Sequence, residues 1–252
     1  LLKPNLINAD PHPVTTPAAC CEAIVNYIRG CSDAEIVIAE GCGIPEMTTD
    51  TIFAQLGYAG LGRRLNIPLV DLNTAPLREI ANPGGDNYPV MILPEIALTH
   101  YLISVPVLKA HSLADITGTL KNMMGLLPPE HYGRQGGAWR KADFHADLHR
   151  NISELNACRA PDLSIMDASV GLASFHLGGP HCQPLVARIL AGDDDALDLC
   201  IAEHRVVVAL SHKHVVLGLA RKPVILDGHC GLVALHVARC GIAPQYPCCL
   251  DV

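Results

Sequence analysis

Residues 15–41 read TTPAACCEAIVNYIRGCSDAEIVIAEG and hold a helix pattern followed directly by a strand pattern. In the first part, apolar residues recur at helical spacing, with Thr16 as a candidate N-cap, Pro17 at the first helical position and Gly30 as the stop. The following run, AEIVIAEG (34–41), has an unbroken apolar centre, as in a strand buried on both faces. A helix that leads into such a strand predicts an α/β fold.

The same alternation continues along the chain. EMTTDTIFAQLGY predicts a second helix that is capped near Thr48 or Thr49. The alternation predicts an α/β fold with a mainly parallel sheet flanked by helices. Because residue 1 is Leu and LLKPNL reads like a strand already under way, we expect a chain truncated at its N-terminus. Further strands are predicted at 67–73, 88–94, 101–107, 161–168 and 185–192.

Composition excludes several classes of protein. A chain of 252 residues that is 50% hydrophobic and 17% charged can bury a core and is not disordered, and its net charge of −7 argues against nucleic-acid binding. The 11 cysteines are scattered rather than arranged as a secreted disulfide framework, which indicates a reducing cytoplasm. The longest apolar tract, VVVALSHKHVVLGLA, is interrupted by His212, Lys213 and His214, so no membrane span is predicted.

The stretch SVPVLKAHSLADITGTLKNMMGL (104–126) brings polar side chains directly after a strand. Ligands of open α/β sheets bind where loops leave the carboxyl ends of strands. Residues 105–141 carry five Lys and Arg against two Asp and Glu, which favours an anionic ligand. TGTLKN predicts a helix start whose free N–H groups attract carboxylate or phosphate. The alternative is a set of solvated charges around an ordinary helix.

We predict a site for a small anionic substrate or cofactor at this loop. His111 would transfer protons, and Lys121 would hold an anion or a covalently attached cofactor. PPEHYGRQGGAWRK (128–141) predicts a mobile loop, which is either a lid over the site at 130–141 or a plain connection. The predicted binding residues are Lys109, Thr117, Gly118, Thr119, Asn122 and Arg134.

ADFHADLHRNISELN (142–156) predicts one amphipathic helix. His145 and His149 stand four residues apart on it, a spacing that can chelate a metal ion. A structural or hydrogen-bonding role is the alternative, because no HExxH pattern or acidic third ligand accompanies them.

Several blocks together resemble the family known as domain of unknown function 362. They include LKPNL (2–6), VDLN (70–73), ISVPVLKAHSLADITGTLKNMMGL (103–126) and HADLHRNISELN (145–156), and the resemblance covers residues 1–198. The family has no assigned reaction. Some relatives carry ferredoxin-type iron–sulphur segments, but this chain has no C-x₂-C-x₂-C run, so no cluster is carried over.

AHSLADITGTLK (110–121) also bears a distant resemblance to nickel-dependent lactate racemases. In those enzymes a histidine is followed ten residues later by a lysine that tethers a nickel pincer nucleotide, and His111 and Lys121 have this separation. The resemblance implies a bound metal or a nickel-pincer-type cofactor. The further histidine and arginine positions of the racemases have no counterpart near EGCGIPE (40–46).

Two classes of function remain open. The first is an enzyme, either racemase- or isomerase-like or redox-associated, that acts on a small anion. The second is an iron–sulphur-associated redox accessory or metal-delivery module that docks a redox protein. We expect 1–198 to form the α/β domain, and the His- and Cys-rich segment 199–252, which departs from the family pattern, to be poorly integrated. The sequence does not specify the oligomeric state.

Overall fold

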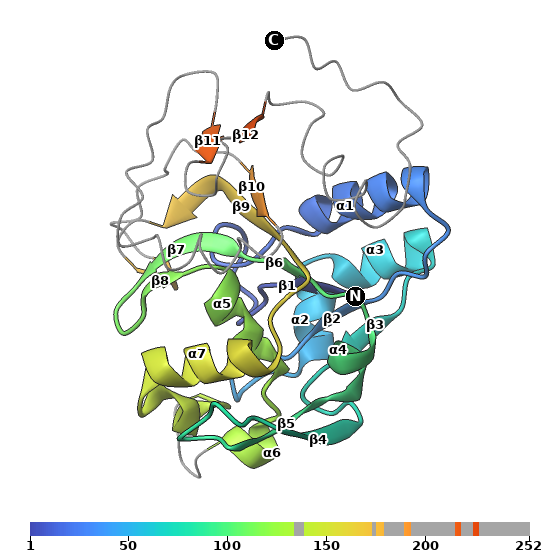
Figure 1. Cartoon of the computed structure of the whole chain (residues 1–252). Helices are drawn as coiled ribbons and strands as arrows, with labels where there is room; N and C mark the ends of the chain where they lie inside the picture. The colour runs from blue at the N-terminus through green and yellow to red at the C-terminus, as the bar shows by residue number, and fades with distance from the viewer. Residues whose placement is uncertain (134–138, 173–174, 179–188, 193–214, 218–223, 227–252) are drawn as a thin grey trace.

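A computed structural model describes residues 1–133, 139–172, 175–178, 189–192, 215–217 and 224–226. Its centre is an eight-stranded sheet in the order β3-β2-β1-β6-β9-β7-β8, with β10 paired to β9 (Figure 1). Within it β8 and β10 run antiparallel to their neighbours and the other pairings are parallel, which confirms the predicted mainly parallel α/β fold. The strands are β1 (Leu2–Pro4), β2 (Ile38–Glu40), β3 (Leu69–Asp71), β6 (Ile103–Val105), β7 (Val107–His111), β8 (Asp115–Thr117), β9 (Leu163–Leu172) and β10 (Ile189–Gly192).

The chain order creates a switch point between β1 and β6. From β1 the chain passes through α1 (Ala18–Cys31) to β2, and then through α2 (Thr49–Gln55) and α3 (Tyr58–Leu65) to β3. It then returns past β1 and continues the sheet on the other side with β6. Loops that leave the carboxyl ends of β1 and β6 therefore diverge, which is where open α/β sheets bind ligands.

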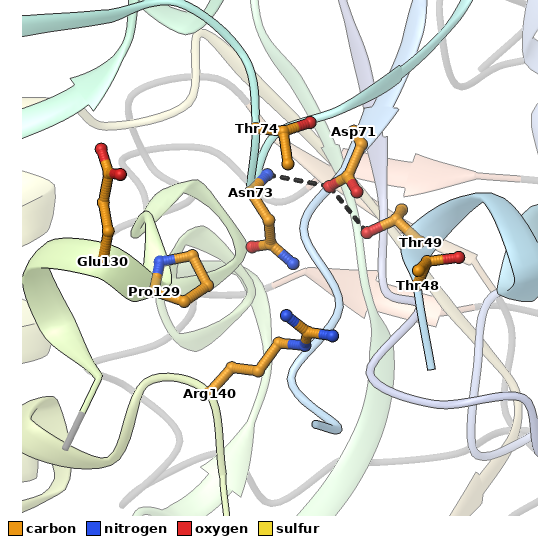
Figure 2. Close-up of a pocket in the computed structure, with 8 residues that line it drawn as sticks. All are labelled: Thr48, Thr49, Asp71, Asn73, Thr74, Pro129, Glu130 and Arg140. Atoms are coloured by element: carbon orange, nitrogen blue, oxygen red, sulfur yellow. Dashed lines mark hydrogen bonds between the residues drawn. The ribbon is translucent and has the colours of Figure 1, made fainter. Parts of the chain in front are cut away.

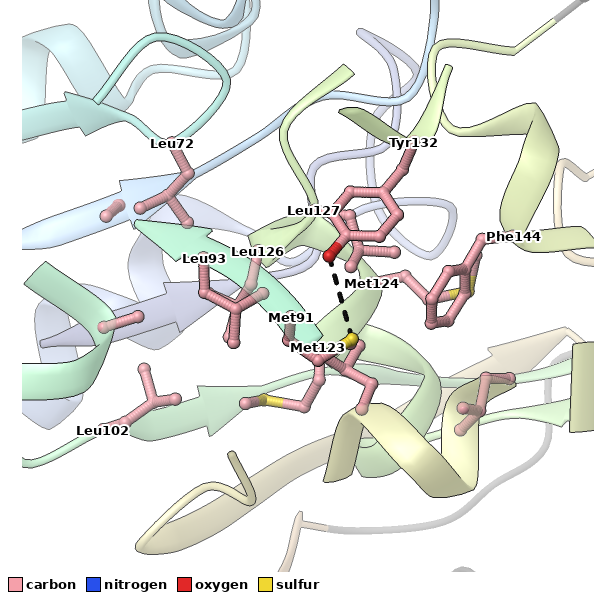
Figure 3. Close-up of a cluster of buried hydrophobic side chains, with 14 of the residues drawn as sticks. Leu72, Met91, Leu93, Leu102, Met123, Met124, Leu126, Leu127, Tyr132 and Phe144 are labelled. Atoms are coloured by element: carbon pink, nitrogen blue, oxygen red, sulfur yellow. Dashed lines mark hydrogen bonds between the residues drawn. The ribbon is translucent and has the colours of Figure 1, made fainter. Parts of the chain in front are cut away.

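Alternating strand residues divide the core between the two faces of the sheet. Leu2 and Ile38 belong to one apolar cluster with α1, α2 and α3, whereas Leu1 and Ala39 belong to the other. Because successive strand side chains point to opposite faces, the two clusters lie on opposite sides of the sheet. Figure 3 shows the second cluster. The elements that follow β3 on this side are β4 (Leu77–Ala81), β5 (Val90–Pro94), α4 (Glu95–Thr99), α5 (Thr119–Asn122), η1 (Met123–Leu126), α6 (Pro129–Tyr132), η2 (Ala142–His145) and α7 (Leu148–Cys158).

The predicted limits of the first helix were wrong, whereas the cap of the second was right. Pro17 is the N-cap of α1, and the helix continues through Gly30 to Cys31. The Thr16 hydroxyl instead accepts a bond from Asn5 N and donates to Val105 O, so it ties the ends of β1 and β6 together. Thr48 caps α2 by accepting a bond from the backbone N–H of Thr51.

Two predicted strands pair in unexpected ways. The strand predicted at 101–107 divides at Pro106 into β6 and β7, which pair with β9 along different parts of its length. Proline has no N–H for a sheet bond, and the Pro106 carbonyl accepts from Asp167 N at 2.8 Å. The strand predicted at 88–94 is β5, which forms a separate antiparallel hairpin with β4.

The predicted boundary at residue 198 lies outside the described residues, as does the segment 199–252 except for β11 (Val215–Leu217) and β12 (Val224–Leu226). These two strands pair antiparallel with each other. Among the described helices, none combines the length and the apolar character needed to cross a membrane.

Candidate functional site

A buried ion pair joins the carboxyl ends of β1 and β2. Lys3 Nζ contacts both carboxylate oxygens of Glu40, at 3.0 and 2.8 Å, and is 3.2 Å from Asn122 Oδ1. Glu40 also accepts from the backbone N–H groups of Gly41 (2.8 Å) and Leu6 (3.2 Å). Lys3 and Glu40 are only 0% and 2% exposed, so this network is part of the core.

At the helix start predicted to bind an anion, the polar side chains are largely hydrogen-bonded within the protein core. Asn122 donates to Lys3 O and Ser104 Oγ, and the Thr119 hydroxyl bonds to Ser164 Oγ. Gly118 is the N-cap of α5, which is only four residues long. These bonds fasten α5 to the sheet, and the anion site expected at this helix start stays a prediction.

Gly125 lies against the ion pair. An added Cβ there would overlap Glu40 Oε1 and Lys3 Nζ. Gly125→Ala should therefore lower the free energy of unfolding by about 1–3 kcal/mol, as overpacked core sites do. Chemical denaturation checks this value. In Gly30→Ala, the matched control, the new Cβ meets no atom within 4 Å, so this helical substitution should be neutral or stabilising. Equal losses in the two variants would contradict the packing argument.

Lys141 is a second buried lysine, and sequence reasoning counted it only as one of the local positive charges. Its Nζ donates to Gly41 O at 2.8 Å and Gly125 O at 2.9 Å, and the residue is 5% exposed. Burial lowers the pKa of its amine to about 7, against the opposing effect of the Glu40 charge. Lys141 thus fixes the start of η2 to the loop that follows β2 and to η1.

Lys109, in the middle of β7, is held in a similar way. Its Nζ donates to Asn5 Oδ1 and Val14 O, both at 2.6 Å, and the residue is 2% exposed. Burial, reinforced by the charge of Lys121, lowers the pKa of the Lys109 amine to about 7. The predicted ligand-binding lysine therefore already has two protein acceptors.

Lys121 has a different environment. It is partly exposed, and no hydrogen bond or ion pair to its Nζ is formed within the part of the chain that the structure describes. Burial lowers the pKa of its amine to about 8. Of the four lysines in the described residues, Lys121 is therefore the one whose amine remains available to a ligand.

Three histidines lie close enough to this amine for its charge to lower their pKa values. The rings of His111 and His176 stack with centroids 4.0 Å apart. Burial first, and then the positive charge of Lys121, lowers the pKa of His111 to about 3 and that of His176 to about 4. Burial and Lys121 also lower the pKa of His145, although its hydrogen bond to the Lys141 carbonyl opposes the shift. We call Lys121, His111, His145 and His176 the Lys121 cluster.

Backbone contacts fix complementary tautomers for two of these rings. His111 Nδ1 accepts from the N–H groups of Leu113 (3.0 Å) and Ala114 (3.1 Å), so its proton resides on Nε2. His145 Nδ1 lies 3.0 Å from Lys141 O, which can only accept, so its Nε2 keeps a free lone pair. At neutral pH the cluster thus offers one imidazole donor and one imidazole acceptor.

The other predicted site residues do not join the cluster. His145 belongs to η2 and His149 to α7, so the prediction of one helix over 142–156 was wrong. The His149 side chain is 64% exposed, with Nε2 4.0 Å from Asp115 Oδ2. Thr117 is buried at the end of β8, and its hydroxyl has no hydrogen-bond partner in the described part of the structure. Arg134 lies outside the described residues.

The described residues do not fit a protein-held metal ion. Among them, no group of three His, Cys, Asp or Glu side chains is arranged to bind one, so we derive no step through a metal. The five cysteines in these residues are free, and burial raises the pKa of Cys20 to about 12. Burial also raises the pKa of the Cys42 thiol, which disfavours the thiolate needed for nucleophilic chemistry.

Both ends of the predicted lid are anchored. Arg140 N donates to Gly43 O at 2.9 Å, and the Arg140 guanidinium donates to the carbonyls of Ile44, Pro45 and Met47. At the other end, the buried Tyr132 packs in the core cluster of Figure 3. Residues 130–133 and 139–141 are thus fixed to the body, and 134–138 lie outside the described residues.

Comparisons with known proteins place the chain in a family. It is 27% identical over 216 residues to the thylakoid-associated protein sll1697 of Synechocystis sp., and the match covers 81% of this chain and 61% of that protein. The chain thus spans less than two thirds of that relative's length. The lactate racemase apoprotein from Thermoanaerobacterium thermosaccharolyticum is similar at a TM-score of 0.45 and 16% identity, over 73% of this chain and 44% of the racemase. A model of the family described as Domain of unknown function (DUF362) matches residues 1–203, and the chain belongs to this family.

Proposed function

We propose that this protein is an enzyme that binds a small anionic substrate at the Lys121 cluster and moves a proton on it with His111 and His145. The observation that carries the proposal is the Lys121 amine, which is partly buried, lowers the pKa of three nearby histidines and lacks a protein acceptor in the described residues. A charged amine that leaves bulk water needs a compensating partner, and a carboxylate or phosphate oxygen would supply it.

The histidines support proton transfer rather than charge attraction. Since the pKa values of His111 and His176 are lowered to about 3 and about 4, both rings are neutral at pH 7. His111 Nε2–H can donate to a substrate oxygen, and His145 Nε2 can accept a proton. A neutral donor and a neutral acceptor at one place are suited to proton abstraction next to a carbonyl or carboxylate.

The lowered pKa of Lys121 couples anion binding to pH. The free protein binds the Lys121 proton only below about pH 8, and an anion beside the amine would raise this pKa. Anion affinity is therefore greatest well below pH 8, where Lys121 is protonated, and decreases as the pH rises through 8. A site made of ordinary exposed lysines would lose affinity only near pH 10.

Titration calorimetry with inorganic phosphate and with malonate at pH 6, 7, 8 and 9 tests the site. Lys121→Met, which keeps the length of the side chain without its charge, should weaken binding at pH 7 by at least about tenfold. The control Arg63→Met removes an exposed charge from α3 and should leave binding unchanged. Because Lys121 makes no protein hydrogen bond in the described residues, its replacement should cost less than about 1 kcal/mol of stability. Unchanged binding in Lys121→Met, or affinity that is flat from pH 6 to 9, would contradict the proposal.

A further inference from the structure

A separate pocket lies at the carboxyl ends of β2 and β3. It has a volume of about 280 Å³, and its lining includes Thr49, Asp71, Asn73, Glu130 and Arg140 (Figure 2). The residues come from the start of α2, the end of β3 and the loop that follows it, α6 and the segment before η2. None of them belongs to the Lys121 cluster.

Asp71 presents one fixed carboxylate oxygen to this pocket. Its Oδ1 accepts from Thr49 Oγ1 at 2.7 Å and from Asn73 N at 2.8 Å, as the dashed lines of Figure 2 show. In the described residues, Oδ2 has no hydrogen-bond donor. The two bonds to Oδ1 hold the carboxylate in place, so Oδ2 is a pre-oriented acceptor for a ligand.

Arg140 presents one fixed donor on the opposite wall. Its Nε donates to Ile44 O at 2.8 Å, and its Nη2 donates to Pro45 O at 3.1 Å and Met47 O at 2.8 Å. The Nη1 group has no acceptor among the described residues. Figure 2 shows the guanidinium directed into the pocket below Asn73. Carbonyl acceptors leave the positive charge of the guanidinium uncompensated.

The two charges face the same space without pairing. No ion pair within 4.0 Å joins Arg140 to Asp71 in the part of the chain that the structure describes. A simple anion would meet Arg140 but be repelled by Asp71, and a simple amine would meet Asp71 but be repelled by Arg140. The Glu130 carboxylate, at 67% exposure and 3.1 Å from His131, belongs to the rim. The walls therefore complement a molecule that carries both charges.

We propose that this pocket binds a free α-amino acid, with its carboxylate on Arg140 and its ammonium group on Asp71. The volume is at the small end of ligand pockets, which fits a molecule of this size. Polar neighbours such as Thr48 and Thr74 favour a small or polar side chain over a large apolar one. The inference goes beyond the anion site at Lys121, because it rests on other residues and on a ligand with no net charge.

Titration of the unmodified protein with glycine, serine, acetate and methylamine tests the charge pairing. Glycine and serine should bind with Kd below about 1 mM, whereas acetate and methylamine should bind at least about tenfold more weakly. Acetate that binds as well as glycine would indicate an anion site and overturn the proposal, as would methylamine that binds equally well. Absence of glycine and serine binding up to about 10 mM would also overturn it.

Two variants locate the site. Arg140→Met and Asp71→Asn should each weaken glycine binding by at least about tenfold, and Arg63→Met should not. Arg140 also anchors residues 44–47, so a folded state must be verified by circular dichroism. If Arg140→Met does not fold, Asp71→Asn and the ligand series on the unmodified protein still test whether the pocket binds an amino acid. Lys121→Met should retain glycine binding, and loss of glycine binding in that variant would show that the two sites are not separate.

Discussion

Replacing Glu40 by glutamine should lower the free energy of unfolding by about 3–5 kcal/mol, the cost of removing one partner of a buried ion pair. Lys3 Nζ lies 2.8 Å from Glu40 Oε2, and both side chains are almost completely buried. The amide of glutamine keeps the size of the side chain but leaves the Lys3 ammonium without a counter-charge. It also places an NH₂ group where Gly41 N or Leu6 N donates to the carboxylate.

Chemical denaturation at pH 7 measures the loss, and two controls define its origin. Glu46→Gln makes the same substitution at an exposed position in the next loop and should change stability by less than about 0.5 kcal/mol. The double variant Lys3→Met with Glu40→Leu removes both charges and should recover much of the loss, since apolar replacements of buried pairs are often neutral. A Glu40→Gln variant as stable as Glu46→Gln would show that the pair contributes little.

Local pattern was sufficient to predict much of the fold. The apolar centre of residues 34–41 forms β2, and the Thr48 cap begins α2 as expected. These features depend on residues that are close together in the chain, so they can be predicted from a single sequence. The switch point between β1 and β6 was not predicted, because it depends on the order of the strands in the folded sheet.

The burial and the hydrogen-bond partners of the lysines could not be predicted from the sequence. Counting charges between 105 and 141 treats each as solvated, whereas Lys109 and Lys141 are almost completely buried and bonded to carbonyls or an amide. One acceptor of each lysine lies about 100 residues away in the chain, at Val14 for Lys109 and at Gly41 for Lys141. Only the folded sheet brings these partners together, so spacing could not distinguish Lys121 from its neighbours.

The pocket lined by Asp71 and Arg140 could not be predicted from the sequence for the same reason. In the sequence, Asp71 and Asn73 belonged only to a family block, and Arg140 counted only as one of the local positive charges in a predicted mobile loop. Their relation depends on the loop after β2, whose carbonyls hold Arg140 in place. The stacking of His176, which follows β9 in the chain, on His111 likewise depends on the folded sheet.

Replacing Phe144 by alanine should also lower the free energy of unfolding by about 3–5 kcal/mol. Its ring is 0% exposed, stacks on Tyr88 with centroids 5.1 Å apart and meets Tyr132 edge-on at 5.8 Å. Figure 3 shows it beside Tyr132 and Met124 within the core cluster. Loss of the ring leaves a cavity and removes both aromatic contacts.

The same substitution should weaken phosphate binding, because Phe144 anchors the short η2 helix. Lys141 and His145 flank Phe144 on the chain, and the Lys141 carbonyl sets the tautomer of His145. Phe144→Leu should lose less stability, and Phe175→Ala should lose less than about 1 kcal/mol, since Phe175 is 40% exposed. Denaturation of the three variants measures the effect on stability, and phosphate titration of Phe144→Ala and Phe144→Leu measures the effect on binding. If Phe144→Ala unfolds like Phe175→Ala, this aromatic cluster does not hold η2 against the sheet, and the position of His145 must depend on Lys141 alone.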